Sequence, residues 1–465
     1  MLVGDEADLT FSSTGPGDYW YSNLSGDLKP EIAIGRISAT VEDEVDHVVS
    51  KIISYELDPP KSNWVEKAVL VAHKQGAPGK YQGCKEEIRT YVNYNPTPVF
   101  STLYGASSSV GGDEATNADV TNSINAGKGI VNYRGHGGST CWSNWNIYGQ
   151  NYTTSDARAL NNGEKRPIIF SIACSNSRLD ASSECLAKAF SKTEGGASAF
   201  LGASRSSYTE ANYTYDKELF KALFDYQIYS IGDLSNIAAS KIIDEHGSYG
   251  AYNAKIYLWL GDPAMEAYTD LLNDFNSDNI TITDNGSSIT VSTGVSGCDI
   301  CASSGNNGAT FWQVQDNVSR YTFNTSVRPL YITVTKHNYI PYTAVTGGTF
   351  TSNEYWFGNL YVLGSVVMDG NSTLSILPGT TIKFSSGTEL KINGTLIAQG
   401  SSSAPIHFTS AGSSNWSGIK FENSSSDTLK YCEIDHATYG VYVKESKPTV
   451  ENCEINILYL RFLFL

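Results

Sequence analysis

Apolar and polar positions follow different periods in three successive parts of the 465-residue chain. Up to about residue 269, short apolar runs alternate with longer stretches in which apolar residues recur at helical spacing. This alternation is typical of an α/β domain with a mainly parallel sheet. The pattern predicts strands at 67–73, 129–136, 167–174 and 197–204, and helices at 41–57, 84–94, 184–194 and 215–227.

The second part, residues 270–348, loses the helical spacing. Apolar and polar residues alternate over short runs that are separated by Asn, Gly and Ser turns, which predicts a small β-sandwich of immunoglobulin-like (Ig-like) type. Cys298 and Cys301 form a lone Cys-x-x-Cys pair in this part. Without a second pair or a nearby histidine it gives zinc little support, and we interpret it as ordinary strand and turn.

The third part, residues 349–465, repeats itself loosely. Phe384, Phe408, Ile434 and Ile455 each close a similar strand at similar but irregular intervals, which indicates a right-handed parallel β-helix whose coils bury their inward side chains against one another. Cys432 and Cys453 occupy equivalent places in successive coils, and we expect them to stack inside rather than form a disulfide. The ending, residues 456–465, breaks the pattern, so we expect the β-helix to be C-terminally truncated.

Charge and composition restrict the partners of the chain. The 32 Lys and Arg against 48 Asp and Glu give a net charge of −16, which repels nucleic acid and anionic membranes. No apolar stretch approaches the roughly 20 residues of a membrane span, so no transmembrane segment is predicted. A surface rich in Ser, Thr and Asn favours an extracellular or cell-surface location. No signal peptide is visible at the start, "MLVGDEADL", and we expect the first domain to be N-terminally truncated.

Two predicted strands end on residues suited to catalysis. The run "GIVNYRGHGG" ends on His136, and "RPIIFSIAC" ends on Cys174. The carboxyl ends of parallel strands meet at one edge of a sheet, so the imidazole could activate the thiol as a nucleophile. The amides of Gly137 and Cys174 could then stabilise an oxyanion. Cys141 and Cys185 compete for the nucleophile role, but neither is expected to end a strand.

These motifs belong to a longer ordered set, and with it the sequence resembles the gingipain-type cysteine peptidases of the caspase-like clan. The resemblance covers about residues 1–269 and continues into the Ig-like part. It implies that Cys174 is the nucleophile, that His136 is the general base and acid, that Gly137 lines the oxyanion hole and that Tyr208 forms a wall of the substrate pocket. The matching segments are "LVGDEADL", "DLKPEIAIGRIS", "NYRGHGG", "IFSIACSNSRLD", "LGASRSSY" and "LWLGDPAMEAY".

The sequence departs from the family at two places. An acidic residue of the family orients the catalytic histidine, and the matching position here is Gln75, whose amide can hold the imidazole by a hydrogen bond. The aspartate that gives arginine preference would fall near "KYQGCKEE", where Glu86 and Glu87 follow slightly downstream on a predicted helix. These two glutamates are either pocket residues or a solvated first helical turn.

The sequence therefore predicts a secreted or surface cysteine endopeptidase that acts on protein or peptide substrates through a Cys/His dyad and an acyl-enzyme. It needs no cofactor, and no metal ligand is assigned, although the acidic loops at 4–8, 25–31 and 111–119 could hold structural calcium without any EF-hand spacing. One alternative is a catalytically weak or inactive surface adhesin whose β-helix binds a glycan or a protein. Another is a polysaccharide lyase, but the coils show mostly Ser, Thr, Asn and Gly instead of clustered Asp, Lys or Arg.

Overall fold

The computed structural model describes residues 18–106, 114–275, 279–305 and 310–457. The chain divides into two compact units, Met1–Leu272 and Asn273–Leu465. The predicted opening motif at 2–9 lies outside the described residues, as does nearly all of the ending at 456–465.

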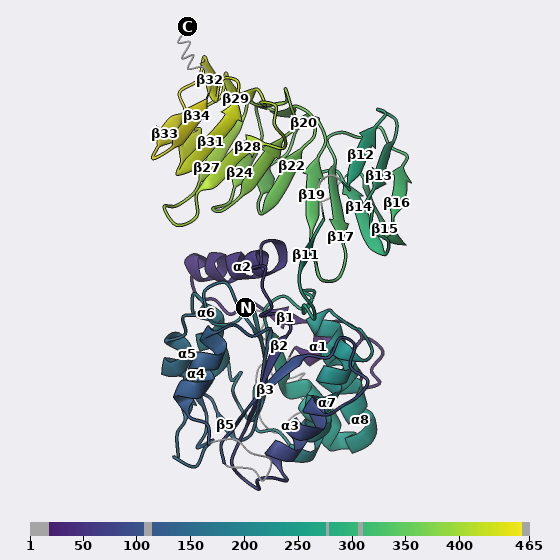
Figure 1. The fold of residues 1–465 in the computed structure, drawn as a ribbon, viewed down its shortest axis with the longest axis vertical. Coiled ribbons are helices and arrows are strands. Elements are labelled where there is room, and N and C mark those ends of the chain that lie inside the picture. The colour runs from purple at the N-terminus through teal and green to yellow at the C-terminus, as the bar shows by residue number, and fades with distance from the viewer. Residues whose placement is uncertain (1–17, 107–113, 276–278, 306–309, 458–465) are drawn as a thin grey trace. The chain divides into compact units, whose positions relative to one another are not determined.

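The first unit is built on a seven-stranded sheet (Figure 1). Five neighbouring strands are parallel, one further strand is antiparallel to them, and the last pairs in parallel with that one. The central strands β4 and β8 are buried at every residue, because helices cover both faces, and this is why their sequences are mainly apolar. In sheet order the strands are β1 (Gly35–Arg36), β10 (Tyr257–Leu260), β9 (Ala199–Ala203), β8 (Ile168–Ile172), β4 (Ile130–Arg134), β2 (Lys67–Ala72) and β3 (Val99–Tyr104).

Helices pack on the two faces of this sheet and form two cores (Figure 1). On one face lie α3 (Tyr81–Arg89), α7 (Thr209–Phe224) and α8 (Ile231–Ile256), and on the other lie α4 (Asn117–Asn125), α5 (Thr154–Arg158) and α6 (Leu186–Lys192). Helix α2 (Glu42–Leu57) lies across one end of the sheet, where it contributes to the first core and contacts α6 (Figure 1). A short helix, α1 (Tyr19–Ser22), precedes β1. Helix α3 ends at Arg89, before the predicted end at 94, because the chain turns there and buries Tyr94 in the core.

The second unit begins with antiparallel strands. One sheet contains β12 (Thr281–Asp284), β13 (Ile289–Ser292) and β16 (Arg320–Phe323), and another contains β14 (Cys298–Ser303), β15 (Trp312–Val318), β17 (Tyr331–Thr335) and β19 (Tyr342–Val345). A two-residue pairing joins β11 (Asn273–Asp274) to β18 (Tyr339–Ile340). Side chains from both sheets share one core. Cys298 and Cys301 both lie in β14, three positions apart, so they face opposite sides of the strand and do not form one metal site.

Parallel strands in three columns complete the unit. The inward side chains of all three columns form one apolar core, and the strands alternate buried and partly exposed residues. The first column continues from β19 through β22 (Asn359–Val362), β25 (Thr381–Phe384), β28 (Ile406–Ser410), β31 (Cys432–Ala437) and β34 (Glu454–Ile457). The second holds β20 (Gly348–Phe350), β23 (Val366–Met368), β26 (Glu389–Ile392), β29 (Gly418–Glu422) and β32 (Val441–Lys444). The third holds β21 (Glu354–Trp356), β24 (Thr373–Ile376), β27 (Thr395–Gln399), β30 (Thr428–Lys430) and β33 (Thr449–Glu451).

The register of the first column corrects one part of the predicted repeat. Phe408 pairs with Ile434 and Ile434 with Ile455, but the partner of Phe408 in the preceding strand is Ile382, not Phe384. A shift of two residues keeps every side chain on the same face of a strand, so the apolar pattern alone does not distinguish the two registers. The same sheet runs without interruption from β15 to β34, across the predicted boundary at 348/349.

The cysteines of both units are free thiols, including Cys432 and Cys453. Among the helices of the described residues, none combines the length and the hydrophobicity needed to cross a bilayer.

Candidate active site

His136 stands on a tightly packed turn after β4. Its carbonyl oxygen accepts hydrogen bonds from the Ser143 amide at 2.9 Å and from the Tyr133 hydroxyl at 2.8 Å. The chain then folds back through a small sheet made of β5 (Gly137–Gly138), β6 (Cys141–Trp142) and β7 (Tyr152–Thr153). These contacts fix the backbone that carries the imidazole.

The glycines on either side of His136 are required by close approach. A Cβ atom on Gly135 would lie 2.5 Å from the Cβ of His73, and one on Gly137 would lie 2.5 Å from the carbonyl oxygen of Cys174. Both distances are shorter than van der Waals contact. The histidine turn therefore packs directly on the backbone of the candidate nucleophile.

Cys174 leaves the neighbouring strand at the same edge of the sheet. The register pairs Arg134 of β4 with Ile172 of β8, and His136 and Cys174 each follow two residues later. The next residue, Ser175, has a φ of +61°, a left-handed conformation that is uncommon for a side-chain-bearing residue and that recurs at functional sites. Such a turn exposes the Cys174 thiol at the end of its strand.

The thiol is held by the segment that follows β9. The Ser207 amide donates to Cys174 Sγ at 3.3 Å, and the Ser207 hydroxyl lies 3.7 Å from the same sulfur. Among the described residues, no hydrogen bond joins Cys174 Sγ to His136, and the Cys174 amide donates to no acceptor. Catalytic hydrogen bonds are often long before substrate binds. The structure thus brings the two side chains to one edge but does not join them.

The competing cysteines have other surroundings. Cys141 lies inside the short strand β6, and its sulfur is 3.4 Å from the Ser143 hydroxyl. Cys185 precedes α6 and is almost fully buried, and this burial raises the pKa of its thiol. Neither follows a strand of the seven-stranded sheet.

Gln75 contacts the imidazole of His136. Gln75 Oε1 lies 2.5 Å from His136 Nε2 and also accepts a hydrogen bond from Lys80 Nζ at 3.2 Å. Because an amide oxygen only accepts, His136 Nε2 carries a proton, which leaves Nδ1 as the basic nitrogen of the neutral ring. Burial, with the nearby Lys80 charge, lowers the pKa of His136, which favours that neutral form.

A second histidine, His73, supports this group and was not singled out by the sequence. It follows β2 and accepts the Gln75 amide on Nδ1 at 2.9 Å, and its ring stands edge-on to that of His136 with 4.8 Å between centroids. Burial lowers the pKa of His73 to about 4, with a smaller contribution from His136. The signal for it was present, because "VLVAH" ends an apolar strand on a histidine just as "IVNYRGH" does.

Asn176 connects the turns that follow β4 and β8, and this connection could not be predicted from the sequence. Its side-chain Nδ2 donates to the carbonyls of Gly138 at 2.6 Å and Cys141 at 2.9 Å. Its Oδ1 accepts from the Ser171 hydroxyl at 2.8 Å, which in turn accepts from Trp142 Nε1 at 2.9 Å. We call this buried group the Asn176 clasp.

Tyr208 lies beside the site and is about half exposed. It follows Ser207, and its amide donates to Asn253 Oδ1 at 2.9 Å. Its ring packs edge-on against Tyr249 and Tyr252, with centroids 4.6 and 5.3 Å apart. These three tyrosines form an aromatic group on the side of the candidate nucleophile.

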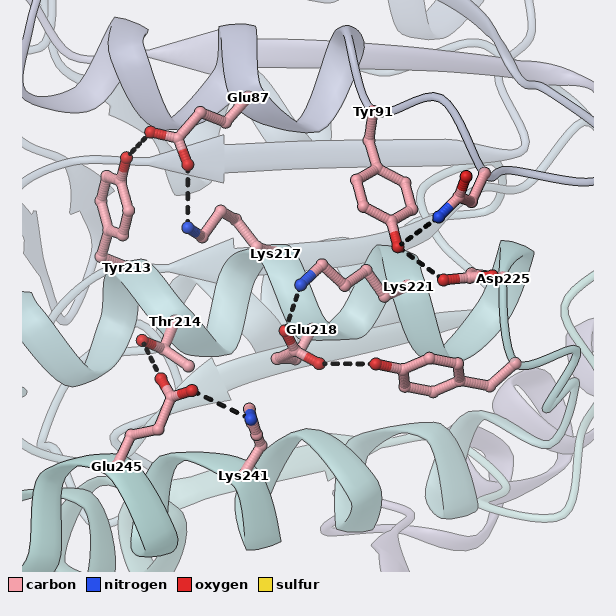
Figure 2. Close-up of polar contacts among 12 residues, drawn as sticks. Glu87, Tyr91, Tyr213, Thr214, Lys217, Glu218, Lys221, Asp225, Lys241 and Glu245 are labelled. Carbon is pink, nitrogen blue, oxygen red and sulfur yellow. Dashed lines mark hydrogen bonds and ion pairs between the residues drawn. The ribbon is translucent and has the colours of Figure 1, made fainter.

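Glu86 and Glu87 are both engaged by residues of the first unit. Glu86 binds Arg89 and accepts a hydrogen bond from the Tyr104 hydroxyl. Glu87 binds Lys217 at 2.8 Å and the Tyr213 hydroxyl (Figure 2). Neither carboxylate is therefore left as an unpaired negative charge for a basic substrate.

The carboxylates of the acidic loop at 25–31 accept hydrogen bonds from nearby backbone amides. Glu31 accepts from the amides of Leu24 and Ser25, and Asp27 accepts from the amide of Lys29. The loop at 4–8 and residues 111–113 of the third loop lie outside the described residues. Within the described ranges, no group of three or more His, Cys, Asp or Glu is placed to hold a metal ion.

A mainly parallel, helix-covered sheet whose neighbouring strands end in histidine and cysteine defines a caspase-like α/β domain of the cysteine-peptidase class. The sequence model of peptidase family C25 matches residues 1–268. The chain therefore belongs to peptidase family C25, which confirms the resemblance over these residues and places it among the cysteine-type peptidases, a class of hydrolases.

Known relatives agree with this assignment. Lys-gingipain of Porphyromonas gingivalis is 26% identical over 221 residues, which are 46% of this chain and 12% of the relative. Gingipain R2 of the same species is 27% identical over 201 residues, 42% of this chain and 26% of the relative. The chain thus spans about a quarter or less of the length of these relatives. A crystal structure of the Arg-specific cysteine proteinase gingipain R has the same fold with a TM-score of 0.61 at 17% identity, over 71% of this chain and 78% of that one.

Proposed function

We propose that this chain is a secreted or cell-surface cysteine endopeptidase that cleaves protein or peptide substrates with Cys174 and His136. The observation that carries the proposal is the register of β4 and β8, which sets both residues two positions beyond a paired Arg134 and Ile172 at one sheet edge. The contact of Gly137 with the Cys174 backbone keeps the two turns together.

In the proposed reaction the Cys174 thiol gives its proton to His136 Nδ1, and the sulfur attacks the substrate carbonyl carbon. The Cys174 amide, together with that of Gly137, stabilises the oxygen that becomes negative. His136 then protonates the leaving amine, which completes the acyl-enzyme. A water molecule, deprotonated by the same imidazole, releases the acid and restores the thiol.

Gln75 serves as the positioning residue of this dyad. Its hydrogen bond to Nε2 selects the tautomer with a basic Nδ1, and the bond from Lys80 keeps its oxygen turned toward the ring. An amide does not stabilise an imidazolium as a carboxylate does. We therefore expect the dyad of Cys174 and His136 to act without a charged third residue. No cofactor enters the reaction.

For the second unit we propose an Ig-like β-sandwich followed by a right-handed parallel β-helix. What supports the sandwich is the core shared by two antiparallel sheets. What supports the β-helix is the set of three parallel columns around one apolar interior. A glycan or protein ligand for its outer face remains a prediction from sequence.

The activity is tested with an iodoacetamide probe and a peptide library, applied to the full chain and to three variants. Labelling should fall on Cys174 at neutral pH, and cleavage should disappear in Cys174→Ala and in His136→Ala. Cys141→Ala is the matched control, since it removes a partly exposed thiol nearby, and it should keep both signals. Equal labelling of Cys141 and Cys174, with no peptide cut, would overturn the proposal.

A further inference from the structure

Arg134, the last residue of β4, is a buried cation with unused hydrogen-bond donors. Its side chain is 2% exposed, and only Nη2 is bonded, to the carbonyl of Thr209 at 2.9 Å. Nε and Nη1 have no acceptor, and in the described part of the chain no carboxylate forms an ion pair with it. Buried charges are normally paired, so we expect an anionic partner for a cation that is buried without one.

Two other buried cations of the same unit, both lysines, are satisfied, whereas Arg166 also leaves its Nη1 without an acceptor. Lys85 binds the carboxylate of Asp216 at 2.6 Å and contacts Asn132. Lys51 donates to the carbonyls of Ser191 at 2.8 Å and Thr193 at 2.6 Å. Arg134 instead lies between two aromatic rings, with its guanidinium carbon 5.5 Å from the centroid of Tyr81 and 5.4 Å from that of Tyr213. Such rings attract a cation but accept none of its N–H groups in the plane of the guanidinium.

The position of the guanidinium connects it to both catalytic residues. Its ligand Thr209 comes two residues after Ser207, whose amide bonds Cys174 Sγ. Its neighbour Tyr81 packs edge-on against the ring of His136 at 5.7 Å. Arg134 is thus linked through Thr209 and Tyr81 to the segments that hold both residues of the proposed dyad, and we infer that its unpaired donors face the site of the substrate residue next to the scissile bond.

We propose that Arg134 makes this peptidase selective for an acidic residue, Asp or Glu, immediately before the scissile bond, a preference that rests on the peptidase activity proposed above. A substrate carboxylate supplies the missing acceptors and neutralises the buried charge, and guanidinium and carboxylate form the strongest of the charge-assisted hydrogen bonds. An Arg or Lys side chain would meet a like charge, while Glu86 and Glu87 are held by their own partners.

Tyr213 is the residue that admits the carboxylate. Tyr81 is buried, whereas Tyr213 is partly exposed and its hydroxyl is tethered at the surface by Glu87, which also binds Lys217 (Figure 2). In this proposal, rotation of this one ring would uncover the guanidinium from the solvent side. A negative charge on the substrate then replaces the cation–π contact with an ion pair.

The test compares kcat/KM of the full chain for peptides that differ only in the residue before the scissile bond: Asp, Glu, Asn, Gln, Arg or Lys. Wild type should prefer Asp or Glu over the matching amide by at least tenfold, and over Arg and Lys by more. Arg134→Met should lose at least tenfold on the acidic peptides and bring the acid-to-amide ratio close to one. Arg158→Met, which removes a surface arginine paired with Glu184, should retain the wild-type ratio.

Labelling of Cys174 by iodoacetamide in each variant separates a specificity effect from a folding defect. If Arg134→Met does not fold, the acidic preference is tested with the wild-type profile and with Arg134→Lys, which keeps the charge. A wild-type preference for basic or uncharged residues would overturn the acidic preference and leave the peptidase proposal standing, as would retention of the acidic preference in Arg134→Met. A chain that cuts no peptide and whose Cys174 is unreactive would overturn both.

Discussion

Removing the Asn176 side chain should loosen at once the two turns that carry the proposed dyad. The variant Asn176→Ala deletes two hydrogen bonds to the carbonyls of Gly138 and Cys141 and one from the Ser171 hydroxyl. Asn176 itself is fully buried, so water does not replace these bonds without entering the space that the side chain leaves.

The cost follows from which groups lose their partners. Gly138 and Cys141 are partly exposed, so each carbonyl is assigned about 1 kcal/mol, the low end for an unsatisfied group. The Ser171 hydroxyl is buried and loses its only acceptor, which costs about 2 kcal/mol. The sum is about 4 kcal/mol of unfolding free energy, a large part of what a domain of this size possesses.

Urea unfolding followed by circular dichroism at the helical signal measures this loss in the first unit, because all helices of the described residues lie there. Asn161→Ala, an exposed asparagine, is the control and should change the unfolding free energy by less than about 0.5 kcal/mol. The labelling rate of Cys174 should also change in Asn176→Ala. A loss below about 1 kcal/mol with an unchanged labelling rate would refute the clasp as the connection between the turns.

Three further results are expected. The pKa of His73 is lowered from 6.5 to about 4, so its contribution to stability is complete above pH 6.5 and is lost as the pH falls toward 4. In acid unfolding over that interval, wild type should lose about 3 kcal/mol more unfolding free energy than His73→Phe. Equal losses in the two proteins would contradict the lowered pKa. In Gln75→Glu a carboxylate faces Nε2 of His136, which should raise the pKa of His136 and move the acid limb of the pH–rate profile to a pH higher by about one unit. An unchanged acid limb would argue against contact between residue 75 and His136 in the active enzyme. Leu396→Ala removes a buried side chain of the three-column core and should lower the unfolding free energy by about 2–5 kcal/mol, measured as faster hydrogen exchange in peptides that cover β27. Ile397→Ala, at the half-exposed neighbouring position, should change the exchange rate little. Similar exchange in the two variants would contradict the inward alternation of side chains.

Local pattern was sufficient for the strands that carry the candidate dyad. Strands β4 and β8 are buried on both faces, so most of their positions are apolar or small, with Asn132 and Arg134 as the large polar exceptions, and the polar residue after each strand stands out. His136 and Cys174 were found for that reason. His73 carries the same signal, but nothing in the spacing shows that its ring meets that of His136, because the contact spans two strands.

Contacts between side chains that are far apart in the sequence could not be predicted from the sequence. Glu86 and Glu87 are candidates for a pocket by position, and only the packing of α3 beside α7 and β3 gives them Lys217, Tyr213 and Tyr104 as partners. The loop containing Asn176 shows no periodicity, so the clasp has no local signature. The two-residue shift between Phe384 and Ile382 was also not predictable, since either register buries the same face.

The sequence by itself determined the order of the elements, the faces that they bury and the candidate residues that follow β4 and β8, because hydrophobic burial repeats with the period of the backbone and depends on local sequence. Only the tertiary structure decided which charges are neutralised and which are not. Arg134 is one of two polar residues, with Asn132, in a mainly apolar strand. Its place between two tyrosines depends on helices α3 and α7, which are separated from it in sequence. Electrostatic pairing depends on distance in space, and distance in space is set by the topology of the sheet.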